Sequence, residues 1–305
     1  GVENSLNASS PAFFLLIMLK VFNLALIKPN ASFFCTFIHS KLINMKIALI
    51  GAGNVATVLG RMLLKNNHTV VQVINRNIDH AQKLAEELQA SYTDFNGQPD
   101  LSADLFIIAV SDYALQESLP HFYINDKLIV HTAGSVNKDV LKIISSNYGV
   151  LYPLQSLRKE MEEIPPVPFL VDGNNEGVFQ YIEAFARTLS NDVQRTTDEE
   201  RLKLHTAAVI VSNFTNHLYA IAEDFCKSEH IDFKLLKPLI LETAQRIMNM
   251  SPADVQTGPA VRKDIQTLDK HLRLLVNHPK LRTTYLRLSD SIMNPQGGTF
   301  KGLKV

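Results

Sequence analysis

A glycine turn set between an apolar run and a helix-like stretch is the feature that most constrains this chain. The turn reads Gly51-Ala52-Gly53-Asn54-Val55-Ala56. It follows the apolar run 46–50, and its last two residues begin the helix-like stretch 55–64. Strand, glycine turn and helix in this order form the geometry that a dinucleotide pyrophosphate requires. Gly51 permits the tight turn, Gly53 lets the main chain approach the phosphates, and small Ala56 allows close packing of helix on strand. The N–H groups at the helix N-terminus then favour the anion.

The rest of the chain alternates strand-like with helix-like stretches and then becomes helical throughout. Strands are predicted at 46–50, 69–74, 104–110, 127–130, 149–152, 168–171 and near 193, with helices at 55–64, 78–89 and 176–189. Beyond residue 197 the sequence has helical periodicity, and helices are predicted at 198–228 (one helix or two), 233–250, 261–276 and 280–293. This pattern predicts an α/β fold, a Rossmann-type doubly wound parallel sheet, followed by an all-helical C-terminal domain.

Four segments are expected along the chain. A nucleotide-binding domain spans 45–196, a helical substrate and dimerisation domain spans 197–294, and a loose tail spans 295–305. Residues 1–44 contain an apolar stretch without a preceding basic residue or a clear cleavage site, and Met45 stands directly before the first strand. We interpret 1–44 as a non-native or leader extension, with a cleavable export signal as the alternative.

Composition narrows the class of partner. Thirty basic residues balance thirty acidic ones, so neither nucleic acid nor an acidic membrane surface is an expected partner. The chain has two cysteines, Cys35 and Cys226, which disfavours a disulfide framework and favours a cytoplasmic setting. The histidines lack metal-ligand spacing, so no metal site is predicted.

The end of the second predicted strand bears on the choice of nucleotide. An Asp or Glu at this position binds the ribose 2′-hydroxyl of NAD, whereas this chain has Asn75-Arg76-Asn77. Arg76 can pair with a 2′-phosphate, so Asn75 and Arg76 are predicted to bind NADP. The alternative is that Arg76 is an ordinary surface arginine.

Two further strand ends are predicted to border the cofactor, because ligands of open parallel sheets bind at the carboxyl ends of the strands. Val110 and Ser111 follow one strand, and Thr132, Gly134 and Ser135 follow the next. Small Gly134 admits the nicotinamide ring, while Thr132 and Ser135 can hydrogen-bond its carboxamide or a substrate. A polar turn that merely caps the next helix is the competing interpretation.

The helical stretch 204–222 contains no charged Asp, Glu, Lys or Arg side chain but several polar ones. With regular helical geometry His205, Ser212 and Asn216 share one face, and Asn213 lies alongside. A membrane span is disfavoured because imidazoles and amides are costly in lipid. A buried helix satisfied by its neighbours or by a partner subunit remains open. The other interpretation is a substrate cleft in which His205, Asn213 and Asn216 are catalytic.

A second candidate substrate site joins two predicted helices. Thr257 and Gly258 supply a hydroxyl and main-chain N–H groups, and Arg262 supplies a guanidinium suited to a substrate carboxylate. A plain turn, with Arg262 near the start of the following helix, is the alternative.

Six segments carry a family resemblance: MKIALIGAGNVA, IIAVSD, HTAGS, YPLQS, SNFTNHLY and QTGPAVRKD. Over residues 45–293 the chain resembles a bacterial family of putative NADP oxidoreductases whose helical half is a domain of unknown function. More distantly it is similar to pyrroline-5-carboxylate reductase and to the 6-phosphogluconate and 3-hydroxyacid dehydrogenases. The resemblance implies the fold, an NADP site and a homodimer formed through the helices.

The resemblance also places individual residues. Cofactor-facing motif positions are occupied by Gly51, Gly53, Asn54, Val55, Ser111 and Gly134. The Thr257-Gly258-Pro259 segment stands where pyrroline-5-carboxylate reductases carry a substrate loop. The catalytic lysine of the hydroxyacid dehydrogenases has no counterpart on the uncharged helix.

These observations predict an NADP-dependent oxidoreductase that transfers hydride between nicotinamide and a small carbonyl or imine substrate. A non-catalytic NADP-binding sensor or scaffold protein is the alternative from another class. A flavin in the same glycine turn is a third possibility.

Overall fold

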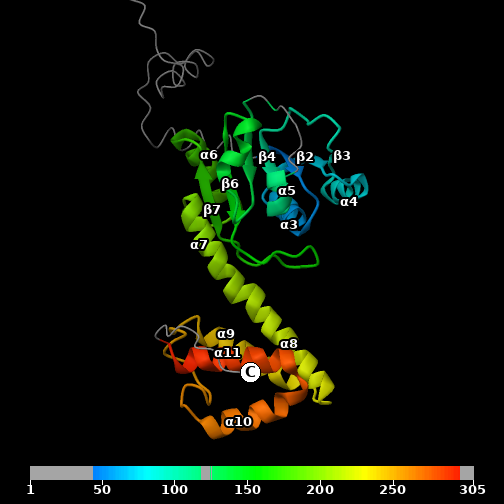
Figure 1. Cartoon of the computed structure of the whole chain (residues 1–305). Helices are drawn as coiled ribbons and strands as arrows, with labels where there is room; N and C mark the ends of the chain where they lie inside the picture. Colours follow the sequence, from blue (N-terminus) through cyan, green and yellow to red (C-terminus); the bar gives the residue numbers. More distant parts are fainter. Residues whose placement is uncertain (1–43, 118–123, 125, 296–305) are drawn as a thin grey trace, which may run out of the picture. The chain divides into compact units, whose positions relative to one another are not determined.

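The computed structural model describes residues 44–117, 124 and 126–295, and these fall into two compact units, 1–206 and 207–305 (Figure 1). The predicted extension, with Cys35, lies outside the described residues apart from Asn44, and so does the tail from residue 296.

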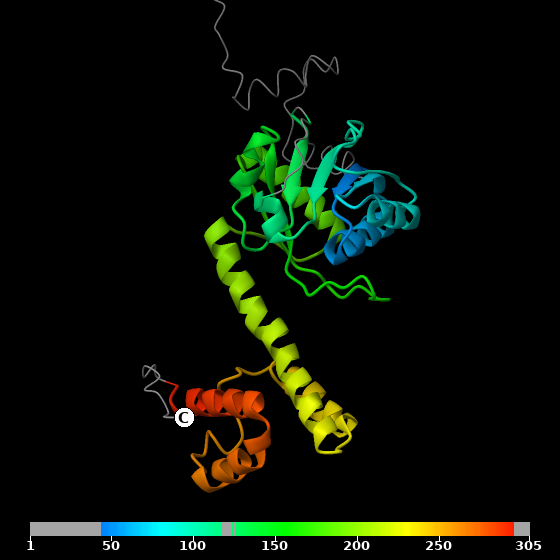
Figure 2. The ribbon, with the colours of Figure 1, turned by 45° about the vertical axis from the view of Figure 1, so that its right-hand side comes forward.

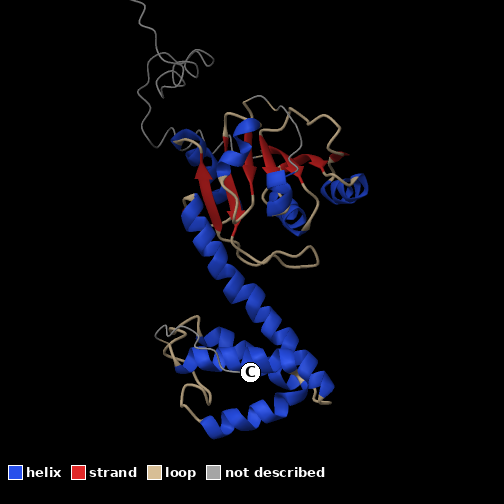
Figure 3. Ribbon diagram, in the orientation of Figure 1, coloured by secondary structure: helices blue, strands red, loops and turns tan. Residues whose placement is uncertain are grey.

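A single sheet forms the centre of the first unit (Figure 3). Its strands are β1 (Lys46–Ile50), β2 (Thr69–Ile74), β3 (Ser91–Thr93), β4 (Leu105–Ile108), β5 (Leu128–His131), β6 (Tyr148–Pro153), β7 (Phe169–Gly173) and β8 (Val193–Arg195). The spatial order is β3-β2-β1-β4-β5-β6-β7-β8, and β1 pairs in parallel with both β2 and β4. The chain therefore has the predicted Rossmann-type α/β fold.

Helices cover both faces of this sheet. They are α3 (Asn54–Lys65), α4 (Ile78–Leu88), α5 (Asp112–Glu117), the 3-10 helix η1 (Lys138–Ile143) and α6 (Glu176–Leu189). Successive strand residues point to opposite faces, so Ile47 and Leu49 pack with α3, α4 and α6, whereas Ala48 and Ile50 pack with α5 and η1. The strands are buried on both sides, as their continuous apolar sequences indicate.

The sheet departs from the predicted all-parallel arrangement at one pair of strands. β7 runs antiparallel to β6. Parallel neighbours need a crossover connection, which is usually a helix, whereas the connection 154–168 contains no helix. In Figure 2 this connection, drawn in green, extends past the strands at the edge where β6 ends. The short strand β3 was not predicted because its residues are largely exposed and lack an apolar pattern.

The second unit is helical. From the end of the first unit the helices are α7 (Asp198–Ala208), the π-helix η2 (Val209–Phe214), α8 (Thr215–Ser228), η3 (Phe233–Leu236), α9 (Lys237–Arg246), α10 (Ile265–Leu274), η4 (Leu275–Asn277) and α11 (Pro279–Met293). The helix predicted to start at 261 starts instead at Ile265, because Asp264 caps it by accepting a hydrogen bond from Thr267 N. Among the described residues, no helix combines the length and the apolar character needed to cross a membrane.

Candidate functional site

The glycine turn after β1 has the geometry that close approach to a ligand requires. Gly51 has φ +121°, a value that favours glycine, and its N–H donates to Ile74 O at 2.7 Å. A Cβ at Gly51 would overlap the carbonyl oxygen of Ala109. Gly53 has an ordinary φ of −90°, and a Cβ there would meet no atom within 4 Å. Gly51 is thus required by the fold, while Gly53 faces open space.

The N-terminus of α3 is available to an anion. Gly53 is the N-cap residue, and no side chain caps the helix. The first N–H groups of a helix have no partner within it and carry partial positive charge. Ala52 and Val55 flank this N-terminus and are half-buried. These main-chain groups are suited to a pyrophosphate.

Asn54, a predicted cofactor residue, has a different contact in the structure. Its Oδ1 accepts a hydrogen bond from Lys159 N at 3.2 Å. Arg61, two turns along α3, donates to Lys159 O at 2.7 Å. Asn54 and Arg61 together hold the β6–β7 connection against α3, the helix that follows the glycine turn. No local pattern predicts this anchoring, because the partners are about one hundred residues apart in sequence.

At the end of β2, Asn75 forms a hydrogen bond within the chain, whereas Arg76 is exposed. Asn75 Nδ2 donates to Asn77 O at 2.9 Å, which stabilises the turn into α4. Arg76 is exposed and forms no ion pair with any residue that the structure describes. Its guanidinium is therefore available to a phosphate, and NADP binding by Arg76 stays a prediction.

The strand ends of β4 and β5 lie at one edge of the sheet. Thr132 is buried, and its N–H donates to Ile108 O at 3.0 Å. Ser111 Oγ accepts from Ala114 N, which caps α5. Ser135 donates from both N and Oγ to the Asp112 carboxylate. These bonds shape the turn, in which Gly134 is buried, and Val110 at the end of β4 is half-buried.

His205 from α7 joins this edge and contacts a residue that was not predicted as part of the site. Tyr152 Oη lies 2.9 Å from His205 Nδ1, and the two rings meet edge to face. The imidazole packs on Gly134, where a Cβ would lie 2.5 Å from Nδ1. Burial and the charge of Asp112 raise the pKa of Tyr152, and the charge of Arg201 opposes them. The signal that could have identified Tyr152 is its place at the end of a predicted strand beside the cofactor edge.

A buried ionic network holds the start of α7 in place. Arg201 is fully buried and donates to Val136 O and to Asp198 Oδ1. Lys138 Nζ joins Asp198 at 3.1 Å and Asp172 at 2.9 Å. Burial acts to raise the pKa of Asp198, but hydrogen bonds from Arg201 and Lys138 outweigh it and lower the pKa. Arg201 lies one helical turn before His205, so this network fixes the imidazole's position.

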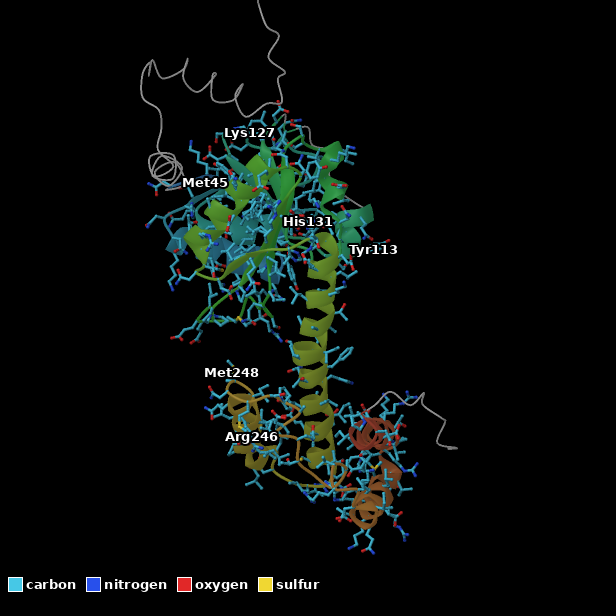
Figure 4. All side chains as sticks on the ribbon, turned by 90° about the vertical axis from the view of Figure 1, so that its left-hand side faces the viewer. Met45, Tyr113, Lys127, His131, Arg246 and Met248 are labelled. Atoms are coloured by element: carbon cyan, nitrogen blue, oxygen red, sulfur yellow. The ribbon has the colours of Figure 1, made fainter. Side chains whose placement is uncertain are left out.

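His131 at the end of β5 is a structural histidine. It lies inside the α/β unit, in contrast to the surface residue Tyr113 (Figure 4). Burial, reinforced by the nearby charge of Arg201, lowers the pKa of His131 to about 3. Its Nδ1 accepts from Ala133 N at 3.1 Å, so the neutral ring carries its proton on Nε2. His131 thereby supports the turn that ends at Gly134.

The other predicted site residues belong to the second unit. Asn213 and Asn216 are exposed, as are Thr257 and Arg262. Gly258 has φ +109°, with no atom within 4 Å of a Cβ position. The shared face predicted for the uncharged helix rested on regular α-helical geometry, which the structure contradicts. Residues 209–214 form a π-helix, so the regular spacing of an α-helix does not hold through this stretch.

Comparison with known proteins places this geometry in context. Residues 167–292 match a domain of unknown function, DUF2520, and residues 36–117 match the shikimate/quinate 5-dehydrogenase family. The structure of the putative NADP oxidoreductase from Bacteroides fragilis is 36% identical, covers 83% of this chain and 99% of its own, and has a TM-score of 0.73. A Thermotoga maritima protein, at 20% identity, covers 80% of this chain and 100% of its own with a TM-score of 0.61.

More distant relatives share the fold. A pyrroline-5-carboxylate reductase from Streptococcus pyogenes is 14% identical, covers 82% of this chain and 99% of its own, and has a TM-score of 0.53. A glutamyl-tRNA reductase of Methanococcus maripaludis is 24% identical over 61% of this chain. The chain spans about half the length of the curated relatives it matches, 52% of this one.

The open sheet, the glycine turn at its switch point and the helical unit define the class of Rossmann-type, nicotinamide-dependent oxidoreductase folds. Within that class, the match to the Bacteroides fragilis protein establishes the family. At 36% identity over 99% of that protein, the chain belongs to its family of putative NADP oxidoreductases.

Proposed function

We propose that this protein is an NADP-dependent oxidoreductase that transfers hydride between nicotinamide and a small carbonyl or imine substrate. The observation that carries the proposal is the open main chain at Gly53 beside the uncapped N-terminus of α3. A pyrophosphate there would accept hydrogen bonds from main-chain N–H groups without meeting a Cβ. The nicotinamide supplies the hydride when bound, and the chain supplies binding, orientation and a proton.

The remaining cofactor contacts follow from the topology. The sheet order reverses between β1 and β4, and ligands bind at such a switch point outside the carboxyl ends of the strands. With the pyrophosphate at the end of β1, Asn75 and Arg76 at the end of β2 would face the adenosine ribose. Ser111, Thr132 and Gly134, at the ends of β4 and β5, would face the nicotinamide.

The substrate residues are proposed on the chemistry of their side chains. His205 and Ser135 lie at the nicotinamide edge of the first unit. For the second unit we retain Asn213 and Asn216 as catalytic candidates, and Thr257, Gly258 and Arg262 as substrate-binding candidates. Arg262 is exposed and carries the guanidinium that a carboxylated substrate would need.

Relatives with this fold guide the choice of test substrates. A reductive aminase from Aspergillus terreus, 16% identical with a TM-score of 0.54, was solved with NADPH and ethyl-5-oxohexanoate. Together with the pyrroline-5-carboxylate reductase, it supports a panel of ketones, keto acids, aldehydes and cyclic imines.

Calorimetry followed by turnover tests the proposal. We expect NADPH to bind more tightly than NADH, and NADPH absorbance to fall with at least one class in the panel. Gly53→Ala should remain folded and lose the binding heat. A folded wild-type protein that releases no heat with either coenzyme would refute the proposal. Binding without turnover would favour the sensor or scaffold alternative, and a visible flavin absorbance would favour the third.

We also propose that the second unit forms a homodimer. It exposes large apolar side chains, among them Val211, Phe214, Leu235, Leu239, Met248, Ile265 and Val276. Exposed apolar surface in this amount favours an association site. Sedimentation at micromolar concentration should give a dimer, and Leu239→Glu with Met248→Glu should give a monomer. Tyr113→Glu, on the exposed surface of the first unit, is the matched control, and a monomeric wild type would refute the dimer.

A further inference from the structure

We propose that Tyr152 is the catalytic residue that protonates the substrate, and that His205 positions its hydroxyl and restores its proton. This inference rests on the proposed oxidoreductase function, and it assigns the proton donor which that function requires. The hydrogen-bonded pair formed by Tyr152 and His205 at the carboxyl edge of the sheet carries it.

The strand register places Tyr152 at the cofactor edge. β5 and β6 are parallel neighbours, and His131 pairs with Val150. Tyr152 is two residues further along β6, level with the turn that follows His131. Because that turn carries Thr132 and Gly134, the phenol stands beside the main chain where a nicotinamide would lie.

The absence of a side chain at Gly134 makes the pair possible. The His205 ring occupies the space that a Cβ at Gly134 would take, and its Nδ1 lies 2.9 Å from Tyr152 Oη. When His205 carries a proton on Nδ1, it donates to Oη, and the tyrosine hydroxyl hydrogen is then free for another acceptor. Both residues are half-buried, so part of the pair remains exposed.

The charges around the pair suit a proton donor. Burial and Asp112, from α5, keep the phenol protonated before reaction. Arg201, from α7, acts in the opposite direction and stabilises the phenolate that forms during the step. Arg201 is itself paired with Asp198, and its charge also acts on neutral His131.

A bound NADPH would supply hydride to the carbonyl or imine carbon, and the π electron pair of that bond would move to the oxygen or nitrogen. The Tyr152 O–H bond breaks as its proton bonds to that atom. The phenolate then takes a proton from His205 Nδ1, and His205 regains a proton from solvent.

The test compares Tyr152→Phe with the control Tyr92→Phe, a tyrosine on the edge strand β3. We expect Tyr152→Phe to bind NADPH as the wild type does while kcat falls about 100-fold, the scale of general acid catalysis. Tyr92→Phe should keep wild-type kcat. His205→Asn, whose amide can donate to Oη, should retain more activity than His205→Ala.

A readout independent of turnover uses ¹⁵N NMR of the imidazoles. Tyr152→Phe should shift the Nδ1 resonance of His205, and Tyr92→Phe should not. An unshifted resonance, or an unchanged kcat in Tyr152→Phe, would overturn this inference while leaving the proposed function intact. Wild-type protein that binds NADPH but reduces nothing in the panel would instead overturn the proposed function, and this inference with it.

Discussion

The imidazole of His205 rests on the main chain of Gly134, so closely that a Cβ at position 134 would lie 2.5 Å from Nδ1 and 2.6 Å from Cγ. Real Cβ atoms do not approach ring atoms so closely, and Gly134→Ala must therefore displace the ring. The hydrogen bond from His205 to Tyr152 would lengthen or break. We expect kcat to fall about tenfold or more, since loss of roughly 1.4 kcal/mol of transition-state stabilisation has this effect. Steady-state kinetics with the reduced coenzyme measures it.

Gly177→Ala is the matched control for this substitution. A Cβ at Gly177 has a single neighbour, Asn175 Oδ1 at 3.4 Å, and the residue lies in the first turn of α6. This variant should keep wild-type kcat and gain slightly in stability, because alanine is the better helix former. Equal kcat values for Gly134→Ala and wild type would show that the His205 ring position is not important to catalysis.

Substitutions of the two glycines in the turn after β1 should affect different properties, stability at Gly51 and coenzyme affinity at Gly53. Gly51→Ala combines a left-handed φ with overlap on Ala109 O, and we expect the free energy of unfolding to drop by about 3 kcal/mol or more. Gly53→Ala meets no atom of the chain. It should keep wild-type stability and lose about tenfold or more in coenzyme affinity.

Urea unfolding and calorimetric titration on both variants separate these effects. Unchanged affinity in a folded Gly53→Ala protein would place the pyrophosphate elsewhere. Unchanged stability in Gly51→Ala would contradict the backbone geometry of the turn.

The contrast between these residues explains what the sequence could predict. The glycine turn and its flanking strand and helix are local, so residue type and spacing were sufficient to predict them. The Rossmann-type sheet followed from the same local patterns, repeated along the chain. Tyr152 and His205 are 53 residues apart, and only the strand register and the packing on Gly134 bring them together.

Other departures have equally physical causes. The direction of β7 depends on the absence of a helix from the β6–β7 connection, which apolar patterns do not encode. The π-helix at 209–214 changes the rotation of a helix whose residues look ordinary one by one. The helix face on which a residue such as Asn216 lies, when inferred from regular helical geometry, is therefore the feature that the sequence determines least.

Arg76 provides a test of coenzyme choice. It is exposed at the end of β2, where the ribose of a bound dinucleotide is expected. Arg76→Asp would replace an attraction for the 2′-phosphate with a repulsion, because a carboxylate favours a 2′-hydroxyl. We expect the affinity for NADPH to fall about 100-fold or more relative to that for NADH, since bonds to charged groups contribute about 1.5–3 kcal/mol each. Calorimetry with both coenzymes measures the ratio.

Arg158→Asp is the control, because it places the same charge change on another exposed arginine, in the β6–β7 connection. That variant should leave the NADPH to NADH ratio nearer the wild-type value. A ratio that does not move in Arg76→Asp would mean that another residue recognises the 2′-phosphate or that the protein does not discriminate.

Stability should depend on pH through His131. Burial lowers the pKa of His131 to about 3 in the folded protein, against an ordinary value of 6.5. Between these values the unfolded chain binds a proton that the folded chain does not, so stability rises with pH and is lost as pH falls below 6.5. One such group contributes about 1 kcal/mol between pH 6.5 and 5.5, and about 1.4 kcal/mol for each further unit.

The measurement is the free energy of unfolding in urea at pH 7.5, 6.5 and 5.5 for wild type and His131→Gln. The variant should be less stable at pH 7.5, because it disturbs a buried position that accepts the Ala133 N–H. Its deficit should shrink by about 1.4 kcal/mol between pH 7.5 and 5.5, since only the wild type loses the His131 contribution. Burial also lowers the pKa of His68. His68→Gln therefore serves as a second variant, which should change the slope of the unfolding free energy against pH independently of His131. Parallel pH profiles for wild type and His131→Gln would mean that His131 binds a proton as readily in the folded protein as in the unfolded chain. That result would contradict a neutral His131 ring beneath the Gly134 turn.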